Sequence, residues 1–164
     1  RPTIVDGTAG FGKDGFLLAL LGCTVHFVER APVMAALLED GLKRAQNDSI
    51  VGSIVKQKIE MTWADTCQYL ERLTEDARPD TVYLDPMFST RKKSALTKLE
   101  LRIIRDIVRH NEDSATMLTA ALSAARKRVV VKRPKLNPSL TGHKPHHTLV
   151  GSSISYDVYM CGDK

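Results

Sequence analysis

The sequence predicts an α/β domain with a mostly parallel β-sheet, helices on both faces and an antiparallel hairpin at the C-terminal end. Two observations support this fold class. Apolar, strand-like runs alternate with helix-like segments along most of the chain, which is the pattern of βαβ units with right-handed crossovers. The last two strand candidates lie close together, as in a hairpin. The 164 residues suffice for one domain with a substantial core, so we expect one domain over residues 1–164.

The strand candidates are short apolar runs, and several end in an acidic residue. Five of them alternate with helical segments and are expected to be parallel. Two further candidates close the chain. The parallel strands are predicted at residues 3–6, 24–29, 59–63, 81–84 and 128–132, and the hairpin strands at 148–150 and 156–160.

Helices are predicted between these strands. Residues 13–21 are apolar nearly all round, which predicts a buried helix. The segment 47–58 is polar and poorly periodic, which predicts a loop with a helical piece. Pro32 suits the first turn of a further helix, with an apolar stripe at helical spacing behind it. The stripe is Met34, Leu37, Leu38, Gly41 and Ala45, and other helices are predicted at 66–73, at 115–125 and around Leu99, Ile103, Ile104 and Ile107.

Composition narrows the function classes only modestly. The net charge of +5 and the pI of about 9.2 favour a polyanionic partner weakly. The three cysteines are odd in number, far apart and in no C-x-x-C arrangement, which favours reduced thiols in a cytoplasmic protein. No apolar run has the length of a membrane span. Because the chain lacks an initiator Met, we interpret it as a fragment. The cysteines and the lack of a long apolar run lead us to expect a cytoplasmic protein without membrane contact.

A glycine-rich turn, D-G-T-A-G-F-G at residues 6–12, follows the first strand. Gly10, Gly12 and Gly15 also spell G-x-G-x-x-G, so a dinucleotide site is the alternative. In such sites the first glycine follows the strand almost at once, whereas here three residues separate Asp6 from Gly10. A carboxylate at Asp6 can face the cationic amine of S-adenosylmethionine, but would be poorly placed beside a pyrophosphate. The D-x-x-x-G-x-G pattern also resembles the first motif of S-adenosylmethionine-dependent methyltransferases, and this resemblance favours S-adenosylmethionine as the ligand.

Two further acidic residues follow successive strands. Glu29 ends the second strand and can accept hydrogen bonds from both hydroxyls of a ribose. Asp65, with Thr66 beside it, follows the third strand and can accept a hydrogen bond from an adenine amino group. The alternative for each acid alone is a helix N-cap or a solvated charge. Three acids at the carboxyl ends of successive strands favour a cofactor site.

The tetrapeptide D-P-M-F at residues 85–88 indicates the type of reaction. It resembles the [D/N/S]-P-P-[Y/F/W] signature of methyltransferases that act on exocyclic amino groups. The Asp85 side chain and the Pro86 carbonyl can accept hydrogen bonds from an aromatic amine and aim its lone pair, while Phe88 can stack on an extruded base. Neither a metal nor a covalent nucleophile is required. The alternative is a strand-ending turn with Phe88 in the core.

Basic residues are predicted beside this pocket. Two clusters follow the fourth and fifth strands, where an RNA backbone carrying a flipped base would lie. A further stripe, Arg102, Arg105 and Arg109, is interpreted as a solvated helix face. His143, His146 and His147 lack the Cys or carboxylate spacing of a metal site, so we expect a flexible loop that touches substrate and no metal. The predicted RNA contacts are Arg91, Lys92, Lys93, Lys132, Arg133 and Lys135.

Four segments together resemble the ribosomal RNA small subunit methyltransferase J family. They are V-D-G-T-A-G-F-G-K-D-G-F, V-E-R-A-P-V-M-A-A-L-L-E-D-G-L, V-Y-L-D-P-M-F and R-V-V-V-K-R-P. The resemblance implies a Rossmann-like class I methyltransferase with a seven-stranded sheet, which methylates N2 of a guanine in 16S rRNA and releases S-adenosylhomocysteine. It also implies an N-terminal region that this chain lacks. Matching cofactor-contacting positions are Lys13, Asp14, Glu29, Arg30, Asp65, Thr66 and Asp85.

Other functions stay open from the sequence alone. A DNA or other RNA amino-methyltransferase would share the same motif chemistry. An NAD-dependent oxidoreductase would use the same glycines, although no hydride-transfer acid or base stands out. A third alternative is an RNA-binding module that has lost catalysis. The expected partner is 16S rRNA or the small ribosomal subunit, and a monomer is favoured.

Overall fold

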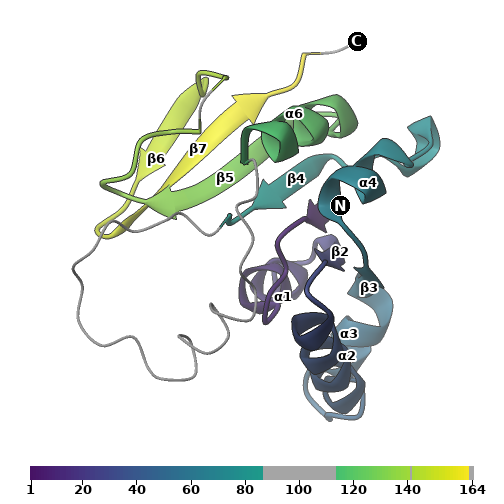
Figure 1. The fold of residues 1–164 in the computed structure, drawn as a ribbon. Helices are drawn as coiled ribbons and strands as arrows, with labels where there is room; N and C mark the ends of the chain where they lie inside the picture. The colour runs from purple at the N-terminus through teal and green to yellow at the C-terminus, as the bar shows by residue number, and fades with distance from the viewer. Residues whose placement is uncertain (87–113, 141, 163–164) are drawn as a thin grey trace.

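The computed structural model describes residues 1–86, 114–140 and 142–162. Within them, seven strands form a single sheet in the order β3-β2-β1-β4-β5-β7-β6 (Figure 1). Strands β1 to β5 pair in parallel, and β7 lies antiparallel between β5 and β6. The predicted fold class, with its C-terminal antiparallel hairpin, is confirmed. None of the described helices has the length and apolar character that a membrane span needs.

The element bounds agree closely with the expectations. The first four strands begin and end where predicted, while β5 runs two residues further and α4 stops two residues earlier. The strands are β1 Thr3–Asp6, β2 Thr24–Glu29, β3 Ile59–Trp63, β4 Thr81–Leu84, β5 Arg128–Pro134, β6 His147–Val150 and β7 Ile154–Met160. The helices are α1 Lys13–Leu20, α2 Pro32–Ala45, α3 Gly52–Lys58, α4 Thr66–Glu71, the 3₁₀ turn Glu75–Ala77 and α6 Ser114–Ala124.

Two apolar cores lie on the two faces of the sheet, because successive strand residues point to opposite sides. In β4, Val82 and Leu84 pack with Leu118 of α6 in one core. Tyr83 between them faces the other core, which contains Phe27 of β2 and Val55 of α3. Figure 1 accordingly shows α4 and α6 on one side of the sheet and α1, α2 and α3 on the other.

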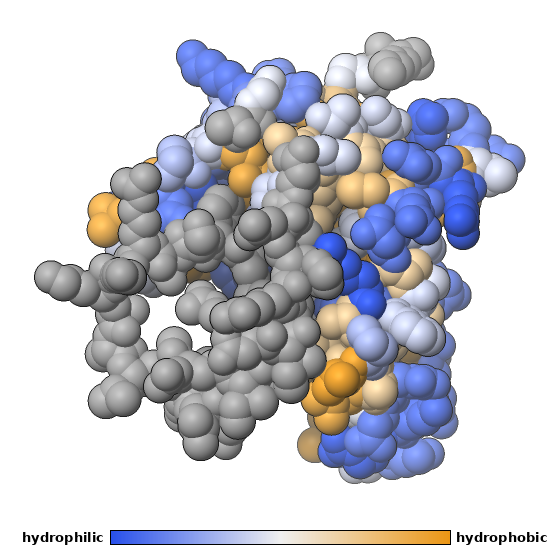
Figure 2. Space-filling view, viewed as in Figure 1, coloured by the Kyte–Doolittle hydropathy of each residue, from blue (hydrophilic) through white to orange (hydrophobic). Residues whose placement is uncertain are grey.

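The prediction that the first helix is buried all round is wrong. In α1, Gly15 and Ala19 are buried, whereas Leu17 is 56% exposed. A short helix on one face of a sheet buries one stripe, so an apolar composition alone does not decide its burial. Leu37 of the predicted α2 stripe is exposed as well. Figure 2 shows mainly hydrophilic residues over the outer side of α2, with a small apolar patch beside them.

Gly15 sets how close α1 lies to the sheet. A Cβ atom at this position would lie 2.1 Å from the Phe27 ring and 2.9 Å from Oδ2 of Asp6. The preceding Gly12 has a positive φ of 72°, which glycine adopts without steric cost, and its position starts the helix. These two glycines bring the first turn of α1, with Asp14, against the end of β1.

Candidate active site

The glycine loop and the Asp85 segment meet at the carboxyl edge of the sheet. Strands β1 and β4 are neighbours, with Asp6 opposite Tyr83. The Gly7 N–H donates to the Tyr83 carbonyl over 2.9 Å, and the Asp85 N–H donates to Oγ1 of Thr8 over 2.6 Å. The structure therefore joins the two predicted motifs by direct hydrogen bonds. This edge is where parallel α/β sheets bind ligands.

Asp6 is the most deeply buried acid of the site, with 2% of its surface exposed. Its Oδ1 accepts a hydrogen bond from the Thr8 N–H over 3.2 Å. Burial raises the pKa of Asp6 to about 7, the Thr8 N–H opposes that rise, and the charges of Asp14, Asp85 and Glu29 add to it. A cation bound at this position would remove that penalty, so the geometry favours a positively charged ligand.

Glu29 holds the glycine loop to the second strand. Its Oε2 accepts from the Gly10 N–H and its Oε1 from the Ala31 N–H, each over 2.8 Å. A carboxylate oxygen has a second lone pair, so both oxygens can accept one more donor each. The side chain is buried at this edge, and it can shape the loop and still accept ribose hydroxyls.

Asp65 and Thr66 have local structural roles. Oδ1 of Asp65 accepts from the Gln68 N–H over 3.1 Å, which makes Asp65 the N-cap of α4. The N-cap alternative is thus observed for Asp65. Thr66 is buried, and its hydroxyl donates to the Gly7 carbonyl. Thr66 therefore supports the glycine loop, and its contact with cofactor stays a prediction.

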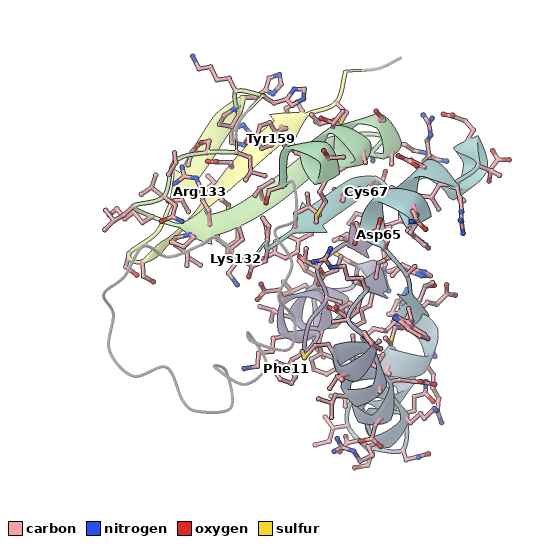
Figure 3. The ribbon with its side chains drawn as sticks, viewed as in Figure 1. Phe11, Asp65, Cys67, Lys132, Arg133 and Tyr159 are labelled. Atoms are coloured by element: carbon pink, nitrogen blue, oxygen red, sulfur yellow. The ribbon has the colours of Figure 1, made fainter. Side chains whose placement is uncertain are left out.

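Lys132 links Asp14 of the first helix to Asp85 after the fourth strand. Its Nζ lies 2.7 Å from Oδ2 of Asp14 and 3.0 Å from Oδ2 of Asp85. The Tyr83 hydroxyl donates to the same Asp14 oxygen over 2.7 Å. Figure 3 shows Lys132 at the carboxyl ends of β4 and β5. Lys13 is exposed and Arg30 half-buried at the same edge.

The pKa values of this cluster move in different directions. Burial raises the pKa of Asp14, but the hydrogen bonds from Lys132 and Tyr83 outweigh it and lower that pKa overall. Burial raises the pKa of Asp85, and Lys132 only partly offsets the rise. Burial lowers the pKa of Lys132, but its bonds to both carboxylates outweigh burial and raise it. The ammonium is therefore held charged between the two acids.

The three predicted RNA contacts after the fifth strand, Lys132, Arg133 and Lys135, have different surroundings in the structure. Lys132 lies in the site, and Arg133 binds the fully buried Asp157 of β7 through Nε over 2.7 Å and Nη2 over 3.0 Å. Arg133 also donates to the Asn137 carbonyl over 2.6 Å. Because β5 continues to Pro134, residues 132 and 133 point to opposite faces and find internal partners. Lys135 is exposed, as an RNA contact must be.

The histidines predicted to form a substrate-contacting loop have varied surroundings. Nδ1 of His146 accepts from the Met160 N–H over 3.0 Å, and Nε2 of His143 lies 3.5 Å from Oγ1 of Thr119. Over residues 1–86, 114–140 and 142–162, no group of three or more His, Cys, Asp and Glu side chains could hold a metal ion.

Several predicted residues lie outside the described residues. They are the stacking residue Phe88, the basic cluster Arg91, Lys92 and Lys93, and the predicted helix with Leu99, Arg102, Ile103, Ile104, Arg105, Ile107 and Arg109. The sequence analysis missed two residues that the structure brings into the site. Thr8 accepts the Asp85 N–H, and Tyr83 binds Asp14. The signal for Tyr83 was its place two residues before Asp85, because alternate strand residues share a face.

The sequence matches the profile of a protein family described as "Putative SAM-dependent methyltransferase" over residues 1–161. The chain belongs to this family. A curated relative, "Ribosomal RNA small subunit methyltransferase J" of Thioalkalivibrio sulfidiphilus, is 46% identical over 162 residues, covering 99% of this chain and 63% of the relative. The crystal structure of a SAM-dependent methyltransferase from Neisseria gonorrhoeae is 35% identical, with a TM-score of 0.79, and the match covers 98% of this chain and 62% of that one.

More distant structures share the fold alone. An rRNA methyltransferase from Streptomyces viridochromogenes matches with a TM-score of 0.64 at 14% identity, covering 98% of this chain and 77% of that one. The chain spans about three fifths of the length of the curated relatives it matches. Family membership assigns S-adenosylmethionine as cofactor, and the buried carboxylates around Asp6 fit a ligand that carries a cationic amine and a sulfonium.

Proposed function

We propose that this protein methylates the exocyclic N2 of a guanine in 16S rRNA. The observation that carries the proposal is the position of Asp85. Asp85 follows the last residue of β4. Its backbone N–H donates to Thr8 of the glycine loop, and its carboxylate pairs with Lys132. Curated relatives that are 44–48% identical carry the name ribosomal RNA small subunit methyltransferase J, which supports small-subunit rRNA as the substrate.

The carboxyl edge of the sheet would hold the cofactor. The Asp6 carboxylate would face the methionine amine, and Glu29 would accept the ribose hydroxyls with its remaining lone pairs. Gly10 and Gly12, both with positive φ, keep the loop free of side chains that would block the ligand. When bound, S-adenosylmethionine supplies the methyl group, and the electron pair of the broken carbon–sulfur bond stays on sulfur. Lys13, Asp14, Arg30 and Asp65 lie along the same edge.

The protein's part in the transfer is to aim the amine. An aromatic amine is a weak nucleophile because its lone pair is delocalised into the ring. The Asp85 carboxylate and the Pro86 carbonyl would each accept one N–H of the amine, which directs the lone pair at the methyl carbon. As the nitrogen–carbon bond forms, the nitrogen releases one proton, which the Asp85 carboxylate accepts and passes to water. Phe88 would stack on the extruded guanine.

The cellular setting follows from the substrate. A protein that modifies rRNA would act in the cytoplasm, on 16S rRNA or the small subunit, and we expect a monomer. Lys135, with Arg91, Lys92 and Lys93, would contact the RNA backbone.

Mass mapping of 16S rRNA tests the proposal. Cells without the gene should lack one methyl group on one guanine, and the gene should restore it. Unchanged rRNA masses would overturn the assignment. Transfer of a labelled methyl group to 16S rRNA, to duplex DNA and to other RNA separates the remaining methyltransferase alternatives. Titration of NADH fluorescence tests the oxidoreductase, which family membership already disfavours.

A further inference from the structure

Lys132 contacts two members of a cluster of four carboxylates that interact with one another at the carboxyl edge of the sheet. The four are Asp6, Asp14, Glu29 and Asp85, and the charges of the last three all act on Asp6. Lys132 reaches Asp14 on α1 and Asp85 after β4 from its own position in β5. Its side chain is 21% exposed, so water screens these contacts only partly.

Resting on the proposed function, we propose that Lys132 is a positioning residue for methyl transfer. Its ammonium fixes the Asp85 carboxylate through Oδ2 and leaves Oδ1 to accept the substrate amine. The orientation of the Asp85 carboxylate is therefore set by contacts from β5, from α1 through the shared lysine, and from the glycine loop. From the sequence, Lys132 was predicted to contact RNA and not to position Asp85.

The backbone prepares the Lys132–Asp85 pair. Strands β4 and β5 are parallel neighbours with Leu84 opposite Val131, so the next residues of the two strands, Asp85 and Lys132, end side by side. The Asp85 N–H is held by Thr8, which fixes the start of the side chain. Because both backbones are fixed, the ion pair needs little ordering of the chain.

The charge of Lys132 lowers the pKa of Asp85 against the effect of burial. Among the residues that the structure describes, four groups act on Asp85: Lys132 from β5, Asp14 from α1, Asp6 from β1 and Tyr83 from β4. Burial raises the pKa of Asp85 already, and without Lys132 the charge of Asp14 would act unopposed at this position. A protonated Asp85 could neither orient the amine through Oδ1 in the same way nor accept its proton.

Carbon-13 NMR titration of the Asp85 carboxyl, in the ligand-free full-length protein, tests the electrostatic part. In Lys132→Met the pKa of Asp85 should rise above the wild-type value, and in Lys132→Arg it should stay near it. Lys127→Met is the matched control, because Lys127 pairs with Asp80 at the opposite end of the same two strands. An unchanged Asp85 pKa in Lys132→Met, or an equal rise in Lys127→Met, would overturn the proposal.

Kinetics test the positioning part. In Lys132→Met, kcat at pH 7 should fall on the order of 10- to 100-fold, with the KM for RNA unchanged, and higher pH should restore part of it. Lys132→Arg should keep the wild-type position of the acid limb of the pH profile. Lys132→Gln serves if the Met variant does not fold. A kcat that stays at the wild-type level in folded Met and Gln variants would overturn the proposal.

The two measurements separate this proposal from the proposed function. The NMR titration needs neither cofactor nor RNA. If the wild-type protein transfers no methyl group to rRNA while Lys132→Met still raises the Asp85 pKa, the proposed function fails and the charge coupling stands. If transfer is normal in the wild type and in the Lys132 variants, the function stands and the positioning role fails.

Discussion

Strands β4 and β5 carry a lysine–aspartate pair at each end, and the two pairs differ in almost every other respect. At the amino end Nζ of Lys127 lies 2.8 Å from Asp80, with the Lys127 side chain 64% exposed. At the carboxyl end Nζ of Lys132 lies 3.0 Å from Asp85, with the Lys132 side chain 21% exposed. Similar distances therefore join the same two residue types in different surroundings.

The surroundings reverse the effect on the acid. The Lys127 hydrogen bond and the Thr3 N–H lower the pKa of Asp80, and burial opposes them only partly. At Asp85 burial outweighs Lys132, and the pKa rises. Asp80 accepts from the Thr3 N–H over 2.9 Å and so ties β1 to the start of β4. The amino-end pair serves the fold, whereas the carboxyl-end pair joins Lys132 to a partly exposed acid whose pKa is raised.

The largest difference is expected on removing each acid in turn. Asp85→Ala should lower the rate of methyl transfer by about 10²- to 10⁴-fold, because orientation and proton acceptance are lost together, while the protein stays folded. Asp80→Ala should keep the rate within about 3-fold and lower the stability by roughly 1 kcal/mol. Rate assays and circular dichroism measure both effects. Near-normal methyl transfer by Asp85→Ala would show that the two lysine–aspartate pairs do not differ in function.

Substitution of Arg133 tests whether this residue stabilises the fold while its neighbour Lys132 acts in the site. Arg133→Met leaves the Asp157 carboxylate buried without its bidentate partner, which costs about 3–5 kcal/mol of stability. Chemical denaturation measures the loss. The Asp85 pKa should not move in this variant if it remains folded, because residue 133 points to the other face. A stability near that of the wild type would show that Asp157 has another partner of equal strength.

The buried Asp6, at the carboxyl edge of the sheet, should make the stability of the protein depend on pH. Its pKa is raised from 3.8 to about 7, so the folded state holds this proton more tightly than the unfolded state, and stability falls as pH rises between those values. Over the two pH units between pH 5 and the pKa of about 7, the fall in stability should be smaller in ligand-free Asp6→Asn by up to about 2.7 kcal/mol. The variant should also bind S-adenosylhomocysteine less tightly at pH 8. Denaturation at pH 5 and pH 8, with calorimetry, provides both measurements.

The smallest effect is expected at Lys135, the exposed member of its cluster. Lys135→Ala should leave stability and cofactor binding unchanged and reduce the salt dependence of RNA binding by about one in the slope of log K against log salt. Filter binding at several salt concentrations measures it. Lys127→Ala is the control with the same charge change away from the site. Equal slopes for Lys135→Ala and the wild type would remove Lys135 from the RNA surface.

Much of the fold could be predicted because its signals are local. Each run that became β1 to β4 is a short apolar segment bounded by polar or turn residues, and Asp6 and Glu29 stand at strand ends in the sequence itself. Once the strands are taken as parallel, their carboxyl ends must meet at one edge. The proximity of the glycine loop to Asp85 follows from that geometry alone.

The rest depends on contacts between distant residues. Arg133 finds Asp157 across β7, and no local pattern indicates that pairing. Lys132 looked like a surface residue because the strand was expected to end there, whereas it continues to Pro134. The exposure of Leu17 depends on what packs against α1, which the composition of the helix cannot specify.

The double ion pair of Lys132 has a chemical consequence. Under the proposed function, the protein would transfer a methyl group to an amine while the side chain of Lys132 places an alkylamine of its own beside Asp85. A protonated nitrogen has no lone pair and cannot attack an electrophilic carbon. Asp14 and Asp85 raise the pKa of the ε-ammonium, so under the proposed function this nitrogen would not compete with the substrate amine for the methyl group.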